Sequence, residues 1–249
     1  MTQRLKGKIA LITGASRGIG AAVAKRFAQE GAQLILVARS SKGLEEVDDE
    51  VQKYGPPAVL VPFDLTDLPR IDDLARSIAE RFGRLDILIG NAGILGGLTP
   101  MTHIKPTFWH QVITTNLHAN WHLLRAFEPL LIKAGEARLI FVTSGITTHP
   151  TAYWGAYTVS KSALEMMVKT YAAEVKHTPF KVNMISPGTV RTALRAEAMP
   201  GEDPMTLPAP EEITEAFVCL AEQSCPWHGE IIRASTFTSP PYSTPPSLP

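Results

Sequence analysis

Tyr157 and Lys161 are the two residues of this sequence whose types and spacing most directly suggest proton transfer. They stand four residues apart in Tyr153-Trp-Gly-Ala-Tyr157-Thr-Val-Ser-Lys161, at the start of a segment predicted to be helical, so both side chains leave one helix face. A phenol has an ordinary pKa of about 10, and a nearby ammonium would bring it closer to neutrality. A solvated helix surface can carry the same pair, with the ring packed along the lysine stem, so the interpretation depends on the rest of the chain.

The composition is that of a globular chain without a bias toward nucleic acid or membrane. The 249 residues are 45% hydrophobic and 19% charged, enough for a substantial core. Twenty-four basic residues balance 24 acidic ones, so no net field recruits nucleic acid or an anionic membrane. We see neither an apolar run of the roughly 20 residues that span a bilayer nor a signal peptide, and we expect a cytoplasmic protein.

The two cysteines do not suggest a metal or a disulfide. Cys219 and Cys225 have no histidine or further cysteine nearby at zinc-ligand spacing. We expect two buried or reduced thiols.

Short apolar segments alternate with longer amphipathic ones along the chain, which predicts an α/β fold with a parallel sheet covered by helices on both faces. One domain is expected over residues 1–238, with a substrate lid at about 193–210 and an extended Pro-rich tail over 239–249. Strands are predicted at 8–13, 33–38, 58–62, 85–89, 137–142, 180–185 and 230–234, and helices at about 18–31, 43–54, 68–82, 107–134, 157–177 and 211–223.

Small, turn-forming or polar residues follow six of the predicted strands. In a parallel sheet of this kind, ligands bind beyond the carboxyl ends of the strands, so these residues are expected to meet at one site. In chain order they are Gly14 to Gly20, Arg39-Ser40, Asp64, Asn91 to Gly93, Thr143-Ser144 and Ser186 to Gly188.

The first of these turns is typical of a diphosphate site. Thr13-Gly14-x-x-x-Gly18-x-Gly20 lies between a strand and a helix, where glycines let the backbone approach a phosphate and the helix N-terminus favours negative charge. Its spacing differs from Gly-x-Gly-x-x-Gly, and a turn needed only for close helix packing is the alternative.

The end of the second strand favours NADP(H) over NAD(H). A carboxylate there would bind the ribose hydroxyls, but this chain has Ala38 followed by Arg39, with Arg17 in the glycine turn. Two guanidiniums can hold a 2′-phosphate, although both could also be solvated surface residues. Asp64 could bind the adenine amino group or form a local Asx turn.

Together these motifs resemble the short-chain dehydrogenases/reductases of about 250 residues. The resemblance covers about residues 5 to 235 and includes the glycine turn, Asp64-Leu65, Asn91-Ala-Gly93, Asn116, Ser144, Tyr157-x-x-x-Lys161 and Pro187-Gly188-x-x-x-Thr192. It implies a Rossmann-type doubly wound sheet of seven strands in the order 3-2-1-4-5-6-7, and hydride transfer between NADP(H) and a carbonyl or alcohol.

The resemblance also implies roles for single residues. Tyr157 would be the general acid of reduction, Ser144 would orient the substrate oxygen, and Lys161 would bind the nicotinamide ribose and lower the pKa of Tyr157. Asn116 would anchor a water that relays protons to Lys161. The cofactor-binding positions are Gly14, Ser16, Arg17, Gly18, Ile19, Gly20, Arg39, Ser40, Asp64, Leu65, Asn91, Ala92, Gly93, Tyr157, Lys161, Pro187, Gly188, Val190 and Thr192.

Two departures from the family pattern concern structure. Gly90 stands where the family often has an asparagine, with little consequence expected, and Gly229-Glu-Ile-Ile-Arg-Ala-Ser235 replaces the usual Val-Asp-Gly-Gly. The last strand often supports tetramers in the family. We expect a homo-oligomer, a dimer or a tetramer, with the 107–134 helix and the Tyr157 helix contributing to its interface.

The loops that carry specificity are mainly apolar. Beside Ser144, we expect Leu95, Ile146 and Trp154 to contact a mainly apolar small-molecule carbonyl, and a 3-oxoacyl thioester is one such substrate. The alternatives are an alcohol dehydrogenase working toward oxidation and a non-catalytic NADP-binding scaffold, since a fold alone does not establish a reaction.

Overall fold

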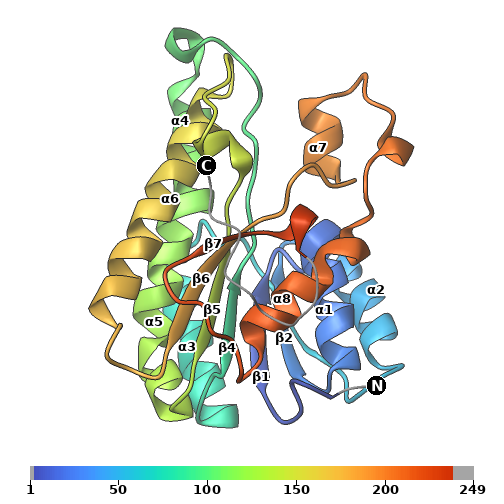
Figure 1. Ribbon diagram of the computed structural model, residues 1–249, viewed down its shortest axis with the longest axis vertical. Helices are drawn as coiled ribbons and strands as arrows, with labels where there is room; N and C mark the ends of the chain where they lie inside the picture. The colour runs from blue at the N-terminus through green and yellow to red at the C-terminus, as the bar shows by residue number, and fades with distance from the viewer. Residues whose placement is uncertain (1–2, 238–249) are drawn as a thin grey trace.

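The fold is a parallel sheet of seven strands, shown in Figure 1 as a computed structural model that describes residues 3–237. The strand order is β3-β2-β1-β4-β5-β6-β7, as the sequence predicted, and every neighbouring pair is parallel. The predicted tail over 239–249 lies outside the described residues. The strands are β1 Ile9–Thr13, β2 Gln33–Ala38, β3 Val59–Pro62, β4 Ile87–Gly90, β5 Arg138–Val142, β6 Lys181–Ser186 and β7 Ile231–Arg233.

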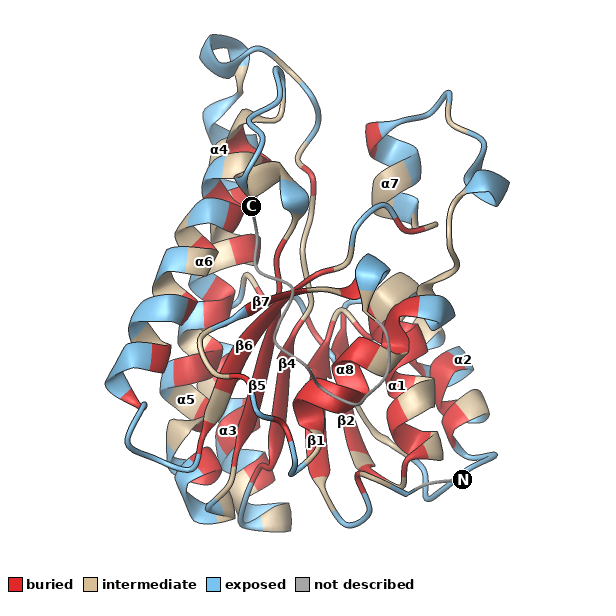
Figure 2. Ribbon diagram, in the orientation of Figure 1, coloured by how far each residue is buried: buried red, intermediate tan, exposed pale blue. Residues whose placement is uncertain are grey.

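Helices cover both faces of this sheet, whose strands are mostly buried (Figure 2), and alternating strand side chains form a core on each side. Ile12 and Leu36 belong to the core beneath one helix layer, whereas their neighbours Leu11 and Ile35 belong to the core beneath the other. The first layer contains α1 Gly18–Gln29, α2 Ser41–Val51 and α8 Thr214–Ala221, and the second contains α3 Pro69–Phe82, α5 Ala119–Ala134 and α6 Gly155–Glu174.

The helix predicted over 107–134 is interrupted by a wider turn. It comprises α4 Pro106–Ile113, a π-helical turn at Thr114–His118 and α5 Ala119–Ala134. Hydrophobic spacing indicated a helix here but not the extra residue that a π turn accommodates. Such turns occur frequently at functional sites.

The predicted lid contains its own short helix. Helix α7, Ala193–Ala198, begins after Thr192, whose hydroxyl accepts a hydrogen bond from the Arg195 amide at 3.2 Å. In Figure 1, α7 stands beyond the carboxyl end of the sheet, across from α4. The helix predicted over 211–223 begins instead as a 3₁₀ turn at Pro210–Ile213 and continues as α8.

The described residues contain no helix long and apolar enough to cross a bilayer. They also contain no group of three or more histidine, cysteine, aspartate or glutamate side chains able to hold a metal. Cys219 and Cys225 are both buried thiols.

Candidate active site

A cavity of about 880 Å³ lies at the carboxyl edge of the sheet, where the strand exits meet. It runs from the glycine turn after β1 to the first turn of α6 and the lid helix α7. All the predicted cofactor positions line it except Gly20, and so do the predicted substrate residues except Leu95. Asn116 is the catalytic candidate that does not reach the cavity.

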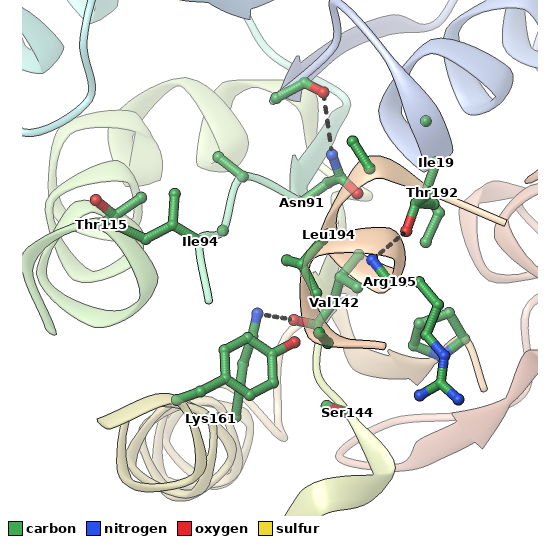
Figure 3. Close-up of a pocket in the computed structure, with 18 of the residues that line it drawn as sticks. Ile19, Asn91, Ile94, Thr115, Val142, Ser144, Lys161, Thr192, Leu194 and Arg195 are labelled. Carbon is green, nitrogen blue, oxygen red and sulfur yellow. Dashed lines mark hydrogen bonds between the residues drawn. The ribbon is translucent and has the colours of Figure 1, made fainter. Parts of the chain in front are cut away.

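Tyr157, Ser144 and Lys161 meet at one end of this cavity. Helix α6 presents Tyr157 and Lys161 on the same face, and the Tyr157 hydroxyl lies near the side chain of Ser144, two residues beyond the end of β5. The Lys161 Nζ lies 5.8 Å from the centre of the Tyr157 ring and donates to the Val142 carbonyl oxygen at 2.7 Å (Figure 3). An ammonium has three N–H donors, so two remain for other partners.

Burial controls the titration of both side chains. Only 7% of Tyr157 is exposed, and burial raises the pKa of its phenol, an effect that the nearby Ser144 hydroxyl partly offsets. Burial lowers the pKa of Lys161 to about 8, and the charge of Glu165 acts in the opposite direction. The phenol pKa is therefore raised and not lowered as the Lys161 charge alone predicted, because desolvation of the buried phenol is the largest effect on it.

Asn116 is completely buried in the π turn, and its side chain is fully hydrogen-bonded. Its Oδ1 accepts from the Ile94 amide at 2.9 Å, while its Nδ2 donates to the Ile94 carbonyl at 3.0 Å and to Ser160 Oγ at 2.9 Å. A Cβ on Gly93 would lie 3.4 Å from Asn116 Oδ1 and 3.5 Å from Lys161 Nζ. Asn116 thus connects the β4 exit to α6 and reaches the neighbourhood of Lys161 across a glycine.

The glycines of the turn after β1 allow α1 to pack closely on β1 and also leave space for a phosphate group. Gly14 and Gly18 have positive φ values of 66° and 57°, and a Cβ at Gly20 would collide with the Gly14 carbonyl. Gly20 therefore permits α1 to pack against β1 and does not line the cavity, which was the alternative for this motif. Asn91 Nδ2 donates to the Thr13 carbonyl at 2.8 Å and joins the β4 exit to this turn.

Arg17, Arg39 and Asp64 lie at the opposite end of the cavity from Tyr157. The Arg39 side chain is 60% exposed and stands 3.8 Å from Asp64. Asp64 also accepts from the amide and hydroxyl of Thr66, both at 2.9 Å. It therefore forms the local turn that was the alternative for this residue and also lines the cavity.

An apolar cluster joins the lid to the catalytic end. Leu95, Tyr157 and Ala198 pack together, with further apolar side chains around them. The Trp154 and Tyr157 rings meet edge to face at 5.9 Å between centroids. Leu95 belongs to this cluster as a buried side chain behind the cavity surface. The partly buried members are Ile146, Trp154 and Leu194.

Sequence reasoning missed the cavity wall that α4 supplies. Gln111 and Thr115 both line the cavity, Gln111 from α4 and Thr115 from the π turn. They stand four residues apart just before Asn116, so shared helix-face spacing was the signal that could have identified them.

Comparison with known proteins agrees with this fold and site. The short chain dehydrogenase family model matches residues 8–203. The oxidoreductase YciK of Escherichia coli K12 is 36% identical over 219 residues, which cover 87% of this chain and 86% of that protein. The 3-oxoacyl-[acyl-carrier-protein] reductase FabG of Thermotoga maritima is 30% identical over 241 residues, or 92% of this chain and 96% of FabG.

Solved structures give the same result. A short chain dehydrogenase from Pseudomonas syringae has a TM-score of 0.91 at 37% identity and covers 94% of this chain and 97% of its own. Another, from Escherichia coli CFT073 in complex with NADPH, has a TM-score of 0.90 at 35% identity over 94% of this chain and 99% of its own. The chain therefore belongs to the short chain dehydrogenase family and is an oxidoreductase of that family.

Proposed function

We propose that this protein is an NADPH-dependent reductase of a mainly apolar carbonyl compound. The observation that carries the proposal is that Tyr157, Ser144 and Lys161 line the same cavity as the glycine turn and two arginines. One end of the cavity thus offers hydroxyl donors for a reacting oxygen, and the other offers cationic and backbone groups for a phosphorylated nucleotide.

The residues of this cavity fit NADPH. Gly14 and Gly18 leave room for a diphosphate at the start of α1, and Asn91 to Gly93 would lie behind the adenosine ribose. Arg17 and Arg39 would hold the 2′-phosphate, which NADH lacks. Solved relatives from Escherichia coli CFT073 and Shigella flexneri contain NADPH and NADP, respectively, which supports this choice of nucleotide.

When bound, NADPH supplies the hydride, and the protein supplies the proton and the orientation. Ser144 would hydrogen-bond the carbonyl oxygen and hold it beside Tyr157. As negative charge develops on this oxygen, the Tyr157 hydroxyl would donate its proton to it. The raised pKa of the buried phenol keeps this proton in place until the reaction. Lys161 would bind the nicotinamide ribose through the N–H groups not bonded to Val142.

The apolar cluster around Tyr157 supports the substrate class. Ile146, Trp154 and Leu194 line the space above the reacting hydroxyls, and Met199 of the lid joins them. A 3-oxoacyl thioester is the leading candidate, supported by the similarity to the Thermotoga maritima 3-oxoacyl-[acyl-carrier-protein] reductase.

The test is NADPH oxidation with a panel of apolar ketones, 3-oxoacyl thioesters and small charged keto acids. We expect turnover of the first two groups, loss of turnover in Tyr157→Phe, and nearly unchanged NADPH affinity in that variant. Tyr171→Phe is the matched control, because its hydroxyl bonds Glu128 outside the cavity. Turnover of charged keto acids alone would contradict the substrate class. NADPH binding without any turnover, together with inactivity toward alcohols and NADP⁺, would favour a scaffold.

We also propose that the enzyme is a homo-oligomer that pairs through α5 and α6. Large apolar side chains stand exposed on these helices, although other apolar side chains of both helices pack on the sheet. An exposed apolar group of this kind is typical of a protein interface. The side chains are Trp121, Ile132, Val159 and Met166.

A further inference from the structure

Glu165 is a half-buried carboxylate one helical turn beyond Lys161 on α6. Its Oε1 accepts hydrogen bonds from the Thr143 hydroxyl and, at 2.9 Å, from the Thr147 hydroxyl. These threonines lie on either side of Ser144, in the loop that leads from β5 into the 3₁₀ turn Gly145–Thr147. One carboxylate oxygen therefore holds both sides of the segment that presents Ser144.

The second threonine extends this contact to the Ser144 backbone. The Thr147 hydroxyl lies 2.9 Å from the Ser144 carbonyl oxygen as well as 2.9 Å from Glu165. A hydroxyl has one proton and both neighbours only accept, so Thr147 shares its proton between them. Glu165, Thr147 and Ser144 thus form one connected network, and an ionised acceptor makes its bonds stronger than neutral ones.

The same carboxylate supplies the negative charge that acts on Lys161. On its own helix Lys161 has Tyr157 one turn before it and Glu165 one turn after it. From β5 it meets the Val142 carbonyl, and across Gly93 it approaches the Asn116 amide of the π turn. Of these groups, only Glu165 carries a negative charge when the phenol is protonated. Burial lowers the pKa of Lys161 to about 8, and the charge of Glu165 raises it.

We propose that Glu165 is a positioning residue of the reductase, fixing the Thr143–Thr147 loop around Ser144 and placing a counter-charge one turn from Lys161. This inference rests on the proposed function, because it concerns the same reaction. It assigns two effects to one side chain, and the two effects can be separated by variants. Removing the hydroxyl of Thr143 or Thr147 leaves the negative charge of Glu165 in place. Glu165→Gln removes that charge but keeps a side-chain oxygen that can accept hydrogen bonds from both threonines.

The experiment compares Glu165→Gln, Thr147→Val and Glu174→Gln with the wild-type enzyme. Glu174 is an exposed acid on the same helix, so its variant controls for loss of one negative charge. The measurements are kcat and KM for carbonyl reduction against pH, thermal unfolding, and the Lys161 titration by NMR of ¹³C-labelled lysine, assigned with Lys161→Arg.

We expect Glu165→Gln to lose reductase activity at lower pH than the wild type. Without the negative charge of Glu165, Lys161 loses its proton at a lower pH. The NMR titration midpoint of Lys161 and the pH at which kcat/KM declines on the alkaline side should therefore both fall by about half a pH unit or more. Thr147→Val should lower kcat severalfold without changing the Lys161 midpoint or the alkaline midpoint of kcat/KM. This variant removes a hydrogen bond that holds the Ser144 loop but keeps the charge of Glu165. Glu174→Gln should match the wild type in every measurement.

Three results would overturn different statements. An active reductase whose Glu165→Gln variant folds and keeps the wild-type pH profile and Lys161 midpoint would overturn this inference alone. A wild-type protein that turns over no carbonyl or alcohol would overturn the proposed function and the catalytic part of this inference, whatever the Lys161 titration shows. If Glu165→Gln does not fold, a Thr147→Val enzyme with unchanged kcat would overturn the positioning role.

Discussion

Asn116 and Ser160 lie 44 residues apart in the chain, yet Asn116 Nδ2 donates to Ser160 Oγ at 2.9 Å in the buried interior. The Ser160 hydroxyl in turn donates to the Tyr157 carbonyl oxygen at 2.8 Å. The π turn is therefore joined to the turn of α6 that carries both Tyr157 and Lys161.

We predict that Ser160→Ala lowers both stability and turnover. The substitution leaves one N–H of the buried Asn116 amide without a partner, which costs about 1–3 kcal/mol. Urea unfolding should show this loss, and kcat should fall severalfold with little change in NADPH affinity. Ser162→Ala is the control, because Ser162 is exposed on the same helix. Equal effects of the two variants would contradict the role of the buried bond.

Arg39→Asp should distinguish the two nicotinamide dinucleotides. A guanidinium that binds the 2′-phosphate contributes to NADPH affinity through charge-assisted hydrogen bonds, and a carboxylate there repels the phosphate. Fluorescence titration should show NADPH binding weakened by about tenfold or more, with NADH affected much less. Arg76→Asp, at an exposed position on α3 outside the cavity, should leave both affinities unchanged. An equal loss of NADH affinity would contradict the proposal that Arg39 binds the 2′-phosphate.

Gly90→Ala should destabilise the fold, although the family often has an asparagine there. A Cβ at Gly90 would collide with Asn120 Oδ1 and the Phe141 ring, both of which are buried. Overpacking of this kind costs about 1–3 kcal/mol, measurable as a lower urea midpoint, and Gly90→Asn should cost more. Gly55→Ala, with open space around its Cβ, is the matched control. A fully stable Gly90→Asn variant would refute this account.

The ion pairs that Glu215 of α8 forms with Arg4 and with Arg26 of α1 should make stability depend on acid pH. Glu215 bonds both Arg4 and Arg26. Burial alone would raise its pKa, but the bonds from Arg4, Cys219 and Arg26 outweigh burial and lower it. A carboxyl whose pKa is lower in the folded state adds stability above its unfolded pKa, and this stability is lost as the pH falls through the folded value.

Glu215→Gln should therefore lower the free energy of unfolding most at pH 7, by about 1–3 kcal/mol. The difference from the wild type should shrink as the pH falls below the ordinary glutamate pKa of 4.5. Urea unfolding across this range is the measurement, with the exposed Glu211→Gln as control. A difference that stays constant with pH would show that the charge of Glu215 has no part in it.

Met166→Glu should dissociate the proposed oligomer. Met166 is 64% exposed on α6, and a charge at the centre of an apolar interface is costly to bury. Light scattering should show a smaller mass for this variant. Met205→Glu, on the equally exposed lid segment, should keep the wild-type mass. A monomeric wild type would contradict the proposal.

The sequence predicted the architecture well because its strands are continuous apolar runs and its strand exits are distinctive. Gly14, Asn91 and Tyr157 each follow or face such an exit, and the cavity includes all three. What sequence could not show depended on contacts between distant residues. The burial that raises the Tyr157 pKa and the contacts of Glu165 with Thr143 and Thr147 exist only after the chain folds.

The π turn at Thr114–His118 sets the angular phase between α4 and α5. A π turn takes in one residue more than an α turn, and one residue of α-helix corresponds to about 100° of rotation. Because α5 is held against the sheet by Leu123 and Phe127, winding the same residues as a regular α-helix would rotate α4 by about 100° around its axis. Gln111 would then face away from the cavity that it lines, so the extra residue of the π turn, and not only the side chains of α4, determines which residues form this wall.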